Sequence, residues 1–523
     1  MTAMPPPFAV SLSVSLRGCV AAAGKHIAFA LVLLTGSSAF ADSDTNRFAA
    51  GGYFRVSTRP DFSGGDGKLG FYNLYGRLMN EGPYAALEMR LDMLQKQASR
   101  ANQPWTSVHA KVEGGSVANA DPNGGALENF ALTQLYAKAG NVGVPGVTWQ
   151  LGTLDSYFGD LGLYDMKPAQ IFFDTVGLSA RYERPRFDLL VGGGDAGYFI
   201  RRDEYDTIFT GGGTLRVRLL PGHFEIGGGG QVWHEPKVAG NRFAPQYTRA
   251  PGTTYEDYVR GEVAQIYLDA NPGGEGDLNP IPTSNTAWKA VGYLGFGAGP
   301  IRWNNLFMNV QKRLPENFYV ESATSGAGTF DYPIHEARLT DERYQLNVGN
   351  EMQLTVIPRR LDAAWAVVYG DYTDGDNDIL PSDDDQTFYS TVLRLQYYLT
   401  NSVHVLGEGA LAKEISRNGN RYREHEDSVF VTEDGVTNNG NGLQFGDADT
   451  RNTVQGKFGF VLNPTGVGVF NRPSLRVLYG VQYSSQNNAF GNSFATSLAD
   501  DNYYGTQERH LHHVIGLEAE AWF

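Results

Sequence analysis

The chain has 523 residues, a formal net charge of −15 and one cysteine. The acidic balance argues against a nucleic-acid partner, and a single cysteine excludes an internal disulfide. Glycine, tyrosine and phenylalanine are abundant (64, 28 and 29 residues), and no segment beyond the N-terminal region is apolar for the roughly 20 residues that a membrane-spanning helix needs. Composition therefore favours a secreted β-protein or an outer-membrane barrel.

The N-terminal residues 1–41 are predicted to be a secretory signal peptide. Basic residues precede an apolar run at 27–34, and residues 39–41 read Ala-Phe-Ala, the small-x-small pattern that signal peptidase cleaves. The apolar run is too short to span a bilayer. No linker or break in composition follows, so we expect residues 42–523 to form one domain.

The first predicted strand contains Gly52-Tyr53-Phe54-Arg55. Because successive side chains of a strand point to opposite faces, Tyr53 and Arg55 share the side opposite Phe54. A further strand is predicted over 71–78, with Leu74 and Leu78 facing lipid and Arg77 facing the lumen.

Further alternating segments follow along the chain, each about as long as a tilted strand that crosses the hydrocarbon layer. They are residues 84–93, 214–219, 390–399, 474–483 and 515–523. The first of these places Tyr84 and Glu88 on the lumenal side, and the last places Trp522 there, beside Glu518 and Glu520. Each segment thus presents one apolar face and one polar or aromatic face.

The predicted connections between strands alternate in length. Residues 220–223 and 399–402 are tight turns, whereas the long polar connections are 236–285, 373–387, 414–452 and 484–508. Short turns at one rim and long loops at the other are typical of a transmembrane antiparallel β-barrel. The length of the chain predicts 18 strands, with 16 as the alternative.

Four short motifs resemble the maltoporin (sugar porin) family. They are G-Y-F-R at 52–55, R-L-M-N-E-G-P-Y-A at 77–85, F-N-R-P-S-L-R-V at 470–477 and G-L-E-A-E-A-W-F at 516–523. The resemblance implies an 18-stranded trimeric barrel with a row of aromatic rings, the greasy slide, along its pore.

The resemblance also assigns site residues. It places Tyr53, Tyr84, Phe470 and Trp522 in the greasy slide, and Arg55 and Arg77 in the polar track that binds sugar hydroxyls. Glu88 is the next inward carboxylate, because Ala86 stands where the family has a glutamate. Trp105, donated by a neighbouring subunit's loop, and Trp288 are additional candidates for the slide. Ile171 stands where the family has a constricting tyrosine.

We therefore expect a non-enzymatic outer-membrane channel that conducts carbohydrates, of the maltodextrin type, by passive diffusion. Its expected partners are the oligosaccharide, outer-membrane lipid, lipopolysaccharide and two further copies of the chain, with no nucleic acid. No cofactor is expected. The acidic loop at Asp374, Asp376 and Asp378 departs from a calcium-binding loop, although it could bridge a divalent cation to lipopolysaccharide.

Two alternatives stay open at this point. One is a general or cation-selective diffusion porin with an acidic lumen, which salt-dependent conductance without sugar block would support. The other is a surface adhesin or structural barrel, which a closed pore would support.

Overall fold

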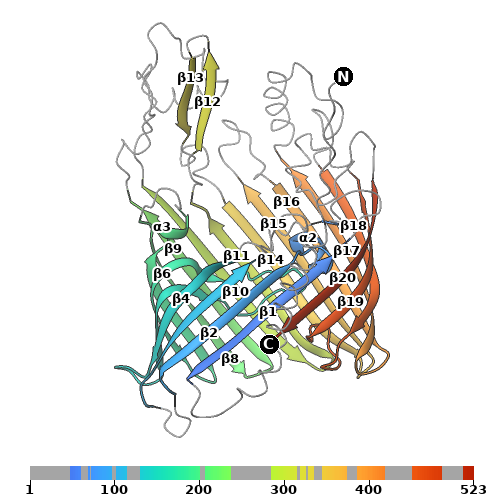
Figure 1. The fold of residues 1–523 in the computed structure, drawn as a ribbon, viewed down its shortest axis with the longest axis horizontal. Helices are drawn as coiled ribbons and strands as arrows, with labels where there is room; N and C mark the ends of the chain where they lie inside the picture. The colour runs from blue at the N-terminus through green and yellow to red at the C-terminus, as the bar shows by residue number, and fades with distance from the viewer. Residues whose placement is uncertain are drawn as a thin grey trace, which may run out of the picture.

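The computed structural model is a closed antiparallel β-barrel (Figure 1), and it describes residues 47–59, 69–70, 72–96, 102–114, 130–200, 207–236, 284–314, 319–325, 328–334, 344–373, 386–417, 450–485 and 510–523. Eighteen strands form one sheet, as the sequence predicted. They are β1 (Phe48–Thr58), β2 (Tyr84–Leu94), β3 (Trp105–Gly114), β4 (Phe130–Gly140), β5 (Val147–Ser156), β6 (Ile171–Glu183), β7 (Phe187–Asp195), β8 (Phe209–Leu220), β9 (Phe224–Glu235), β10 (Asn285–Ala298), β11 (Ile301–Lys312), β14 (Tyr344–Ile357), β15 (Leu361–Thr373), β16 (Gln386–Tyr398), β17 (Val403–Ser416), β18 (Thr450–Leu462), β19 (Ser474–Ser484) and β20 (Leu511–Trp522).

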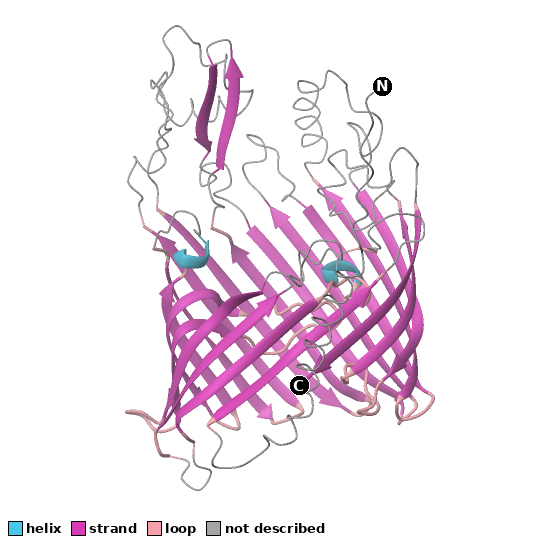
Figure 2. Ribbon diagram, viewed as in Figure 1, coloured by secondary structure: helices cyan, strands magenta, loops and turns pink. Residues whose placement is uncertain are grey.

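The connections divide the barrel into two different rims. Short turns such as 221–223 and 399–402 join strands at one rim, and the strand ends that the longer connections join lie at the other (Figure 2). A separate two-stranded sheet, β12 (Tyr319–Ser325) and β13 (Gly328–Ile334), stands beyond the long-loop rim in Figure 1. The alternation predicted from the sequence is confirmed.

The barrel closes where its last strand pairs with its first. Trp522 of β20 lies opposite Tyr53 of β1. The amides of Gly52 and Phe523 donate to each other's carbonyl oxygens at 2.9 and 3.0 Å. Because this closed ladder has no free edge at the seam, the last strand can end in the middle of the sheet.

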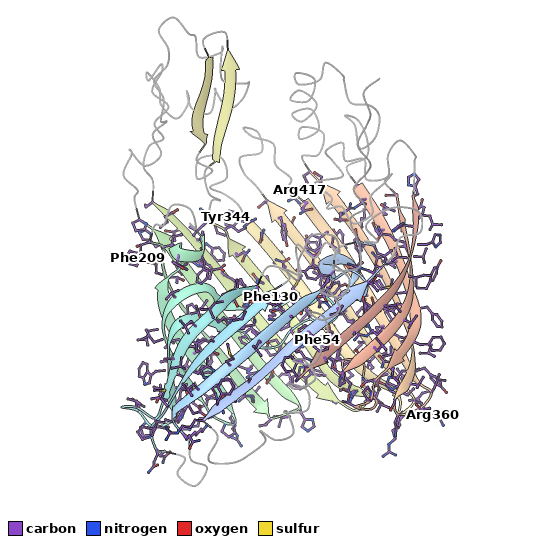
Figure 3. The ribbon with its side chains drawn as sticks, in the orientation of Figure 1. Phe54, Phe130, Phe209, Tyr344, Arg360 and Arg417 are labelled. Atoms are coloured by element: carbon purple, nitrogen blue, oxygen red, sulfur yellow. The ribbon has the colours of Figure 1, made fainter. Side chains whose placement is uncertain are left out.

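The two faces of the strands reverse the burial found in a soluble protein. Leu393, Leu395 and Tyr397 of β16 are exposed on the outside, whereas the intervening Arg394 and Gln396 are almost wholly buried. Side chains cover the outer surface of the strands (Figure 3) between Arg360 at the short-turn rim and Arg417 at the other. An apolar outer band around a polar interior is the arrangement that a lipid environment requires.

The connection between β1 and β2 folds into the barrel instead of continuing as a strand. It contains the short helix α2 (Tyr72–Tyr75), and Gly76 and Met79 adopt positive φ angles of 78° and 60°. The predicted strand over 71–78 is therefore wrong, because its backbone turns here. Leu74 and Leu78 are buried inside the barrel and do not face lipid. A second short helix, α3 (Gly197–Ile200), follows β7, and no helix in the described segments is long and apolar enough to span a bilayer.

The connection at residues 157–170, between β5 and β6, also folds inward. Leu161 and Tyr164 pack in one apolar cluster with Tyr75 of the first inward loop and with residues of β10, β11, β15, β16 and β17. The Leu163 amide donates to Glu351 at 2.7 Å, and the Leu163 carbonyl oxygen accepts from the Arg77 amide at 2.8 Å. The two loops thus hold each other against one side of the wall and leave open space on the other.

Candidate functional site

A cavity of about 730 Å³ remains inside the barrel beside β1 to β5. It is closed on its inner side by residues 157–170 and by the turn between β18 and β19. Seven residues predicted from the sequence line it together: Tyr53, Arg55, Arg77, Tyr84, Glu88, Phe470 and Trp522.

Three of the aromatic rings form a continuous row across the barrel seam. The ring centroids of Tyr53 and Trp522 are 4.6 Å apart, and those of Tyr53 and Tyr84 are 5.8 Å apart. The three residues come from the neighbouring strands β20, β1 and β2, and their alternation turns them to the same side. Trp522 is 62% exposed within this lumenal space, so its ring is available for stacking.

Phe470 lies apart from this row, on the turn after β18. It borders the cavity near Gly162 of the inward loop, where an added Cβ would lie 3.4 Å from its ring. The Arg394 guanidinium lies 5.9 Å from the ring centroid. Phe470 therefore extends the aromatic lining from the wall to the loop.

Glu520 is the centre of the charged network behind the rings. It accepts from the Tyr53 hydroxyl at 2.5 Å and pairs with Arg77 at 3.2 Å and Arg472 at 2.6 Å. Arg476 donates to its second oxygen at 2.8 Å. The hydroxyl of Tyr53 is thus fixed from behind, which orients the ring toward the cavity.

Arg55 and Arg77 hold the first inward loop in addition to lining the cavity. Both guanidinium groups pair with Glu81 of this loop, and Arg55 also donates to the Gly82 carbonyl oxygen at 2.8 Å. Their side chains are 4% and 13% exposed. Burial raises the pKa of Glu81 to about 7, although the two arginines oppose that shift. Arg55 is therefore mainly an anchor of the loop, and Arg77 is the more accessible of the two.

The structure adds lining residues that the sequence reasoning missed. Tyr136 of β4 stacks on His109 with ring centroids 4.7 Å apart. The alternation of residues 130–140 could have placed Tyr136 inside. Tyr157 lies under the Lys167 ammonium, 4.5 Å from its ring centroid, on the inward loop. No periodic pattern marks that loop residue.

Three predicted positions lie elsewhere. Trp105 begins β3 and lines a second cavity of its own barrel, not a loop reaching a neighbouring subunit. Trp288 lies on the outer face of β10, because the adjacent Lys289 points inward and donates to the Gln170 carbonyl oxygen at 2.9 Å. Ile171 is buried at the start of β6 and does not border the cavity, whereas residues of the preceding loop do.

The lining is balanced in charge although the chain is acidic. Six basic and five acidic residues border the 730 Å³ cavity. They are Arg55, Arg77, Lys111, Lys138, Lys167 and Arg472, against Glu88, Asp155, Asp160, Asp165 and Glu351. The acidic lumen expected for a cation-selective channel is therefore wrong for this region.

The described residues contain no group of three or more potential metal ligands from His, Cys, Asp and Glu. The acidic loop at Asp374, Asp376 and Asp378 lies outside the described residues, as does the predicted signal peptide. Neither prediction is tested by the structure.

Comparison with known proteins gives a family for the C-terminal part. Residues 301–523 match the family model described as LamB porin. This range includes Phe470 and Trp522 but not the motifs at 52–55 and 77–85. No curated protein sequence matches the chain.

Solved structures of similar architecture are distant in sequence. OccD3 (OpdP) of Pseudomonas aeruginosa is 9% identical, with 92% of this chain and 91% of that chain covered and a TM-score of 0.42. The outer-membrane channel DcaP of Acinetobacter baumannii is 12% identical, with 91% and 97% covered and a TM-score of 0.34. Wzi of Escherichia coli, described as a carbohydrate-binding β-barrel, is 10% identical, with 90% and 84% covered and a TM-score of 0.36.

The family match and the barrel point to a channel and not to an enzyme. The resemblance to the maltoporin family is confirmed over the matched range. The chain is a porin of the bacterial outer membrane, and its residues 301–523 match the LamB porin family model.

Proposed function

We propose that this porin conducts carbohydrates, with linear maltodextrins as the expected substrates, by passive diffusion along its aromatic row. The observation that carries the proposal is the contiguous set of rings at Tyr84, Tyr53 and Trp522 beside a water-accessible cavity. Aromatic side chains are costly to leave exposed in a polar lumen unless a ligand packs on them. The apolar C–H face of a glucosyl ring is such a ligand.

The polar groups beside the rings suit the hydroxyl groups of the sugar. Glu88 borders the cavity on the same face of β2 as Tyr84, and the Tyr84 hydroxyl itself donates to Glu113. Hydrogen bonds to charged groups are stronger than neutral ones, so a few of them orient a sugar without trapping it. We infer a chain of weak sites of similar affinity, in which a sugar exchanges partners as it moves. Such transport consumes no energy and uses no cofactor.

We also propose that the protein is a homotrimer. Support comes from a stretch of the outer face of β7, β8, β9 and β10 that lacks large side chains. Gly193 lies opposite Gly211, Gly213 lies opposite Gly230, and Gly228 lies opposite Gly292. Because these positions have no side chain beyond Cα, two barrels can approach closely there. Export by the predicted signal peptide 1–41, with 42–523 as the mature domain, belongs to the same proposal.

The direct test is sugar block of single-channel current in a planar bilayer. Maltohexaose is expected to block the wild-type channel, and Trp522→Ala is expected to weaken the block by about three- to tenfold, since one aromatic contact contributes roughly 0.5–1.5 kcal/mol. Phe458→Ala is the matched control, because it removes an aromatic ring from the outer face of β18. An open channel that ignores maltohexaose at millimolar concentration would contradict the proposal and leave a general diffusion pore.

A further inference from the structure

A second cavity lies at the short-turn end of the same side of the barrel. It has a volume of about 440 Å³ and is bordered by residues of β3 to β7 and by the turn between β4 and β5. It shares Lys138, Gln150 and Asp155 with the larger cavity, so the two spaces adjoin. We call it the basic exit cavity. A sugar leaving the aromatic row toward the short-turn rim would meet it next.

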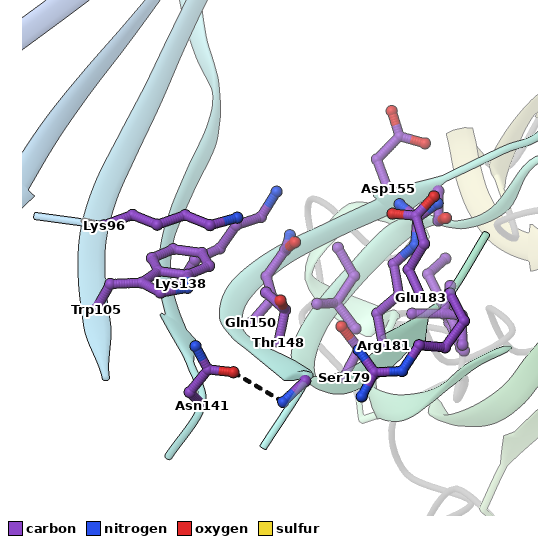
Figure 4. Close-up of a pocket in the computed structure, with 16 residues that line it drawn as sticks. Lys96, Trp105, Lys138, Asn141, Thr148, Gln150, Asp155, Ser179, Arg181 and Glu183 are labelled. Carbon is purple, nitrogen blue, oxygen red and sulfur yellow. Dashed lines mark hydrogen bonds between the residues drawn. The ribbon is translucent and has the colours of Figure 1, made fainter. Parts of the chain in front are cut away.

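The basic exit cavity contains four cations and two carboxylates. Lys96, Trp105 and Lys138 lie on one side of the space, and Arg181 and Glu183 lie on the other (Figure 4). Arg184 is the fourth cation, and Asp155 is the second carboxylate. The excess of positive charge is larger here than in the first cavity.

Both carboxylates are already engaged by other groups. Asp155 accepts from the side-chain amides of Gln134 at 3.3 Å and Gln170 at 2.8 Å. Glu183 pairs with Arg218 at 3.2 Å. Neither of them pairs with a cation of the basic exit cavity in the described part of the chain.

The cations differ in how far they are neutralised. Arg181 is held by both oxygens of Asp188, at 2.8 and 2.5 Å. Lys96, Lys138 and Arg184 have no carboxylate partner within the described segments. They lie instead over aromatic rings: Lys96 is 5.8 Å from the Trp105 ring, Lys138 is 5.1 Å from the Tyr136 ring, and the Arg184 guanidinium is 4.4 Å from the Tyr182 ring. A cation–π contact at an accessible site contributes only about 0.5–1 kcal/mol, so these groups can turn to an anion at little cost.

We propose that the basic exit cavity binds the anionic group of an acidic sugar, a carboxylate or a phosphate, so that anionic saccharides belong to the substrates of this channel. The proposal deepens the proposed function and rests on it for the path that leads to the cavity. Three cations without carboxylate partners would form no ion pair with a neutral sugar. A simple inorganic anion would not pack on the Trp105 ring beside them. Charge-assisted hydrogen bonds from Lys96, Lys138 and Arg184 would hold the anionic group. Thr148, Gln150 and Ser179 would reach the sugar hydroxyls.

The test compares charged and neutral probes on the same channel. Trigalacturonate and glucose 6-phosphate supply the two anionic groups, maltotriose supplies the neutral sugar, and inorganic phosphate supplies an anion without a sugar. In 0.1 M KCl, trigalacturonate or glucose 6-phosphate is expected to block wild type at a concentration at least about tenfold below that of maltotriose. The preference is expected to shrink in 1 M KCl, because salt screens charges. The tighter of the two anionic probes identifies the preferred group.

The double variant Lys96→Gln/Arg184→Gln is expected to weaken block by the anionic sugars about tenfold and to change maltotriose block less than twofold, because neither residue borders the larger cavity. Lys96→Arg keeps the charge and is expected to retain the block. Lys413→Gln, which removes an exposed lysine on the outer face of β17, is the matched control. Heat-dependent electrophoretic mobility checks that every variant is folded.

Two results would overturn the proposal. One is equal block of wild type by trigalacturonate, glucose 6-phosphate and maltotriose. The other is block by inorganic phosphate as tight as that by the sugars, which would show an anion site without a role for the saccharide. If maltodextrins fail to block but the anionic sugars block through Lys96 and Arg184, the maltodextrin proposal fails and this one stands.

Discussion

The inner wall carries charged side chains around its circumference, but its two sides use them differently. On β16 to β18, Arg394 donates to Glu408 at 2.7 Å and Lys457 donates to the same carboxylate at 2.8 Å. All three side chains are at most 3% exposed. On β2 to β5, inward residues such as Glu88 and Lys138 border open cavities instead.

The difference comes from the loop that covers one side. The Lys457 ammonium also donates to the Tyr75 carbonyl oxygen at 2.9 Å, and the Tyr75 hydroxyl donates to Glu414 at 2.8 Å. Asn80 donates to Gln455 at 3.2 Å. The same alternation of side chains along the strands thus gives a buried ionic network where the loop between β1 and β2 covers the wall. Where that loop does not cover the wall, the inward side chains line an open cavity.

The largest effect on stability is expected from disrupting the buried ionic network of β16 to β18. Glu408→Ala would leave Arg394 and Lys457 buried without their shared carboxylate, which should lower the free energy of unfolding by about 3–5 kcal/mol. Glu88→Ala, on the open side, should change it by less than about 0.5 kcal/mol. Urea unfolding in lipid vesicles measures both. Similar losses in the two variants would remove the distinction between the sides.

Releasing the loop between β1 and β2 from the wall should open the lumen along β16 to β18. Glu81→Ala frees Arg55 and Arg77 from their shared partner, and we expect larger single-channel conductance together with weaker maltohexaose block. The weakening should be at least about tenfold if one charge-assisted contact to the sugar is lost with the loop, since such contacts contribute roughly 1.5–3 kcal/mol. Lys413→Ala, which removes an exposed charge from the outer face of β17, is the control. Unchanged conductance would show that the loop is held without Glu81.

A smaller effect is expected from a ring outside the main row. Tyr136→Ala removes an aromatic ring from the open side without touching Glu520 or its arginines. Maltohexaose block should weaken about threefold, the value of a modest aromatic contact. Titration of the ion current gives the change, and no effect would confine the sugar path to Tyr84, Tyr53 and Trp522.

The smallest expected effect is on ion selectivity as a function of pH. Burial raises the pKa of Asp160, and the nearby charge of Asp165 raises it further. Asp160 should therefore gain a proton at a higher pH than an ordinary aspartate, and the ratio of cation to anion permeability should start to fall there as the pH is lowered. Reversal potentials in a KCl gradient measure this, and Asp160→Asn should remove the early step. An identical pH profile in the variant would assign the early change in selectivity to other carboxylates.

Much of the barrel could be predicted because the alternation of side chains along a strand can be read from a short stretch of sequence. The alternation around Tyr53, Tyr84 and Trp522 placed each of them on the lumenal face, where the structure has them. Trp288 was chosen by resemblance and not by phase, and the inward Lys289 beside it shows the error.

The inward loops could not be predicted in the same way. Leu161 and Tyr164 pack against strands far away in the sequence, and such contacts leave no periodic signal. Arg77 does reach the lumen, but it does so from a folded loop and not from the predicted strand. The second cavity depends on the relative positions of several strands and turns, so its charge could not be read from any one segment.

The seam between the first and last strands also bears on how the protein folds. Tyr53 and Glu520, which share a hydrogen bond, are 467 residues apart in the sequence. Bringing such distant residues together carries a larger loop-closure entropy than any neighbouring hairpin in the barrel. The aromatic row is therefore assembled only when the cylinder closes. A chain that has not completed its last strand pairing lacks this row, so the proposed block by maltohexaose would also report complete folding.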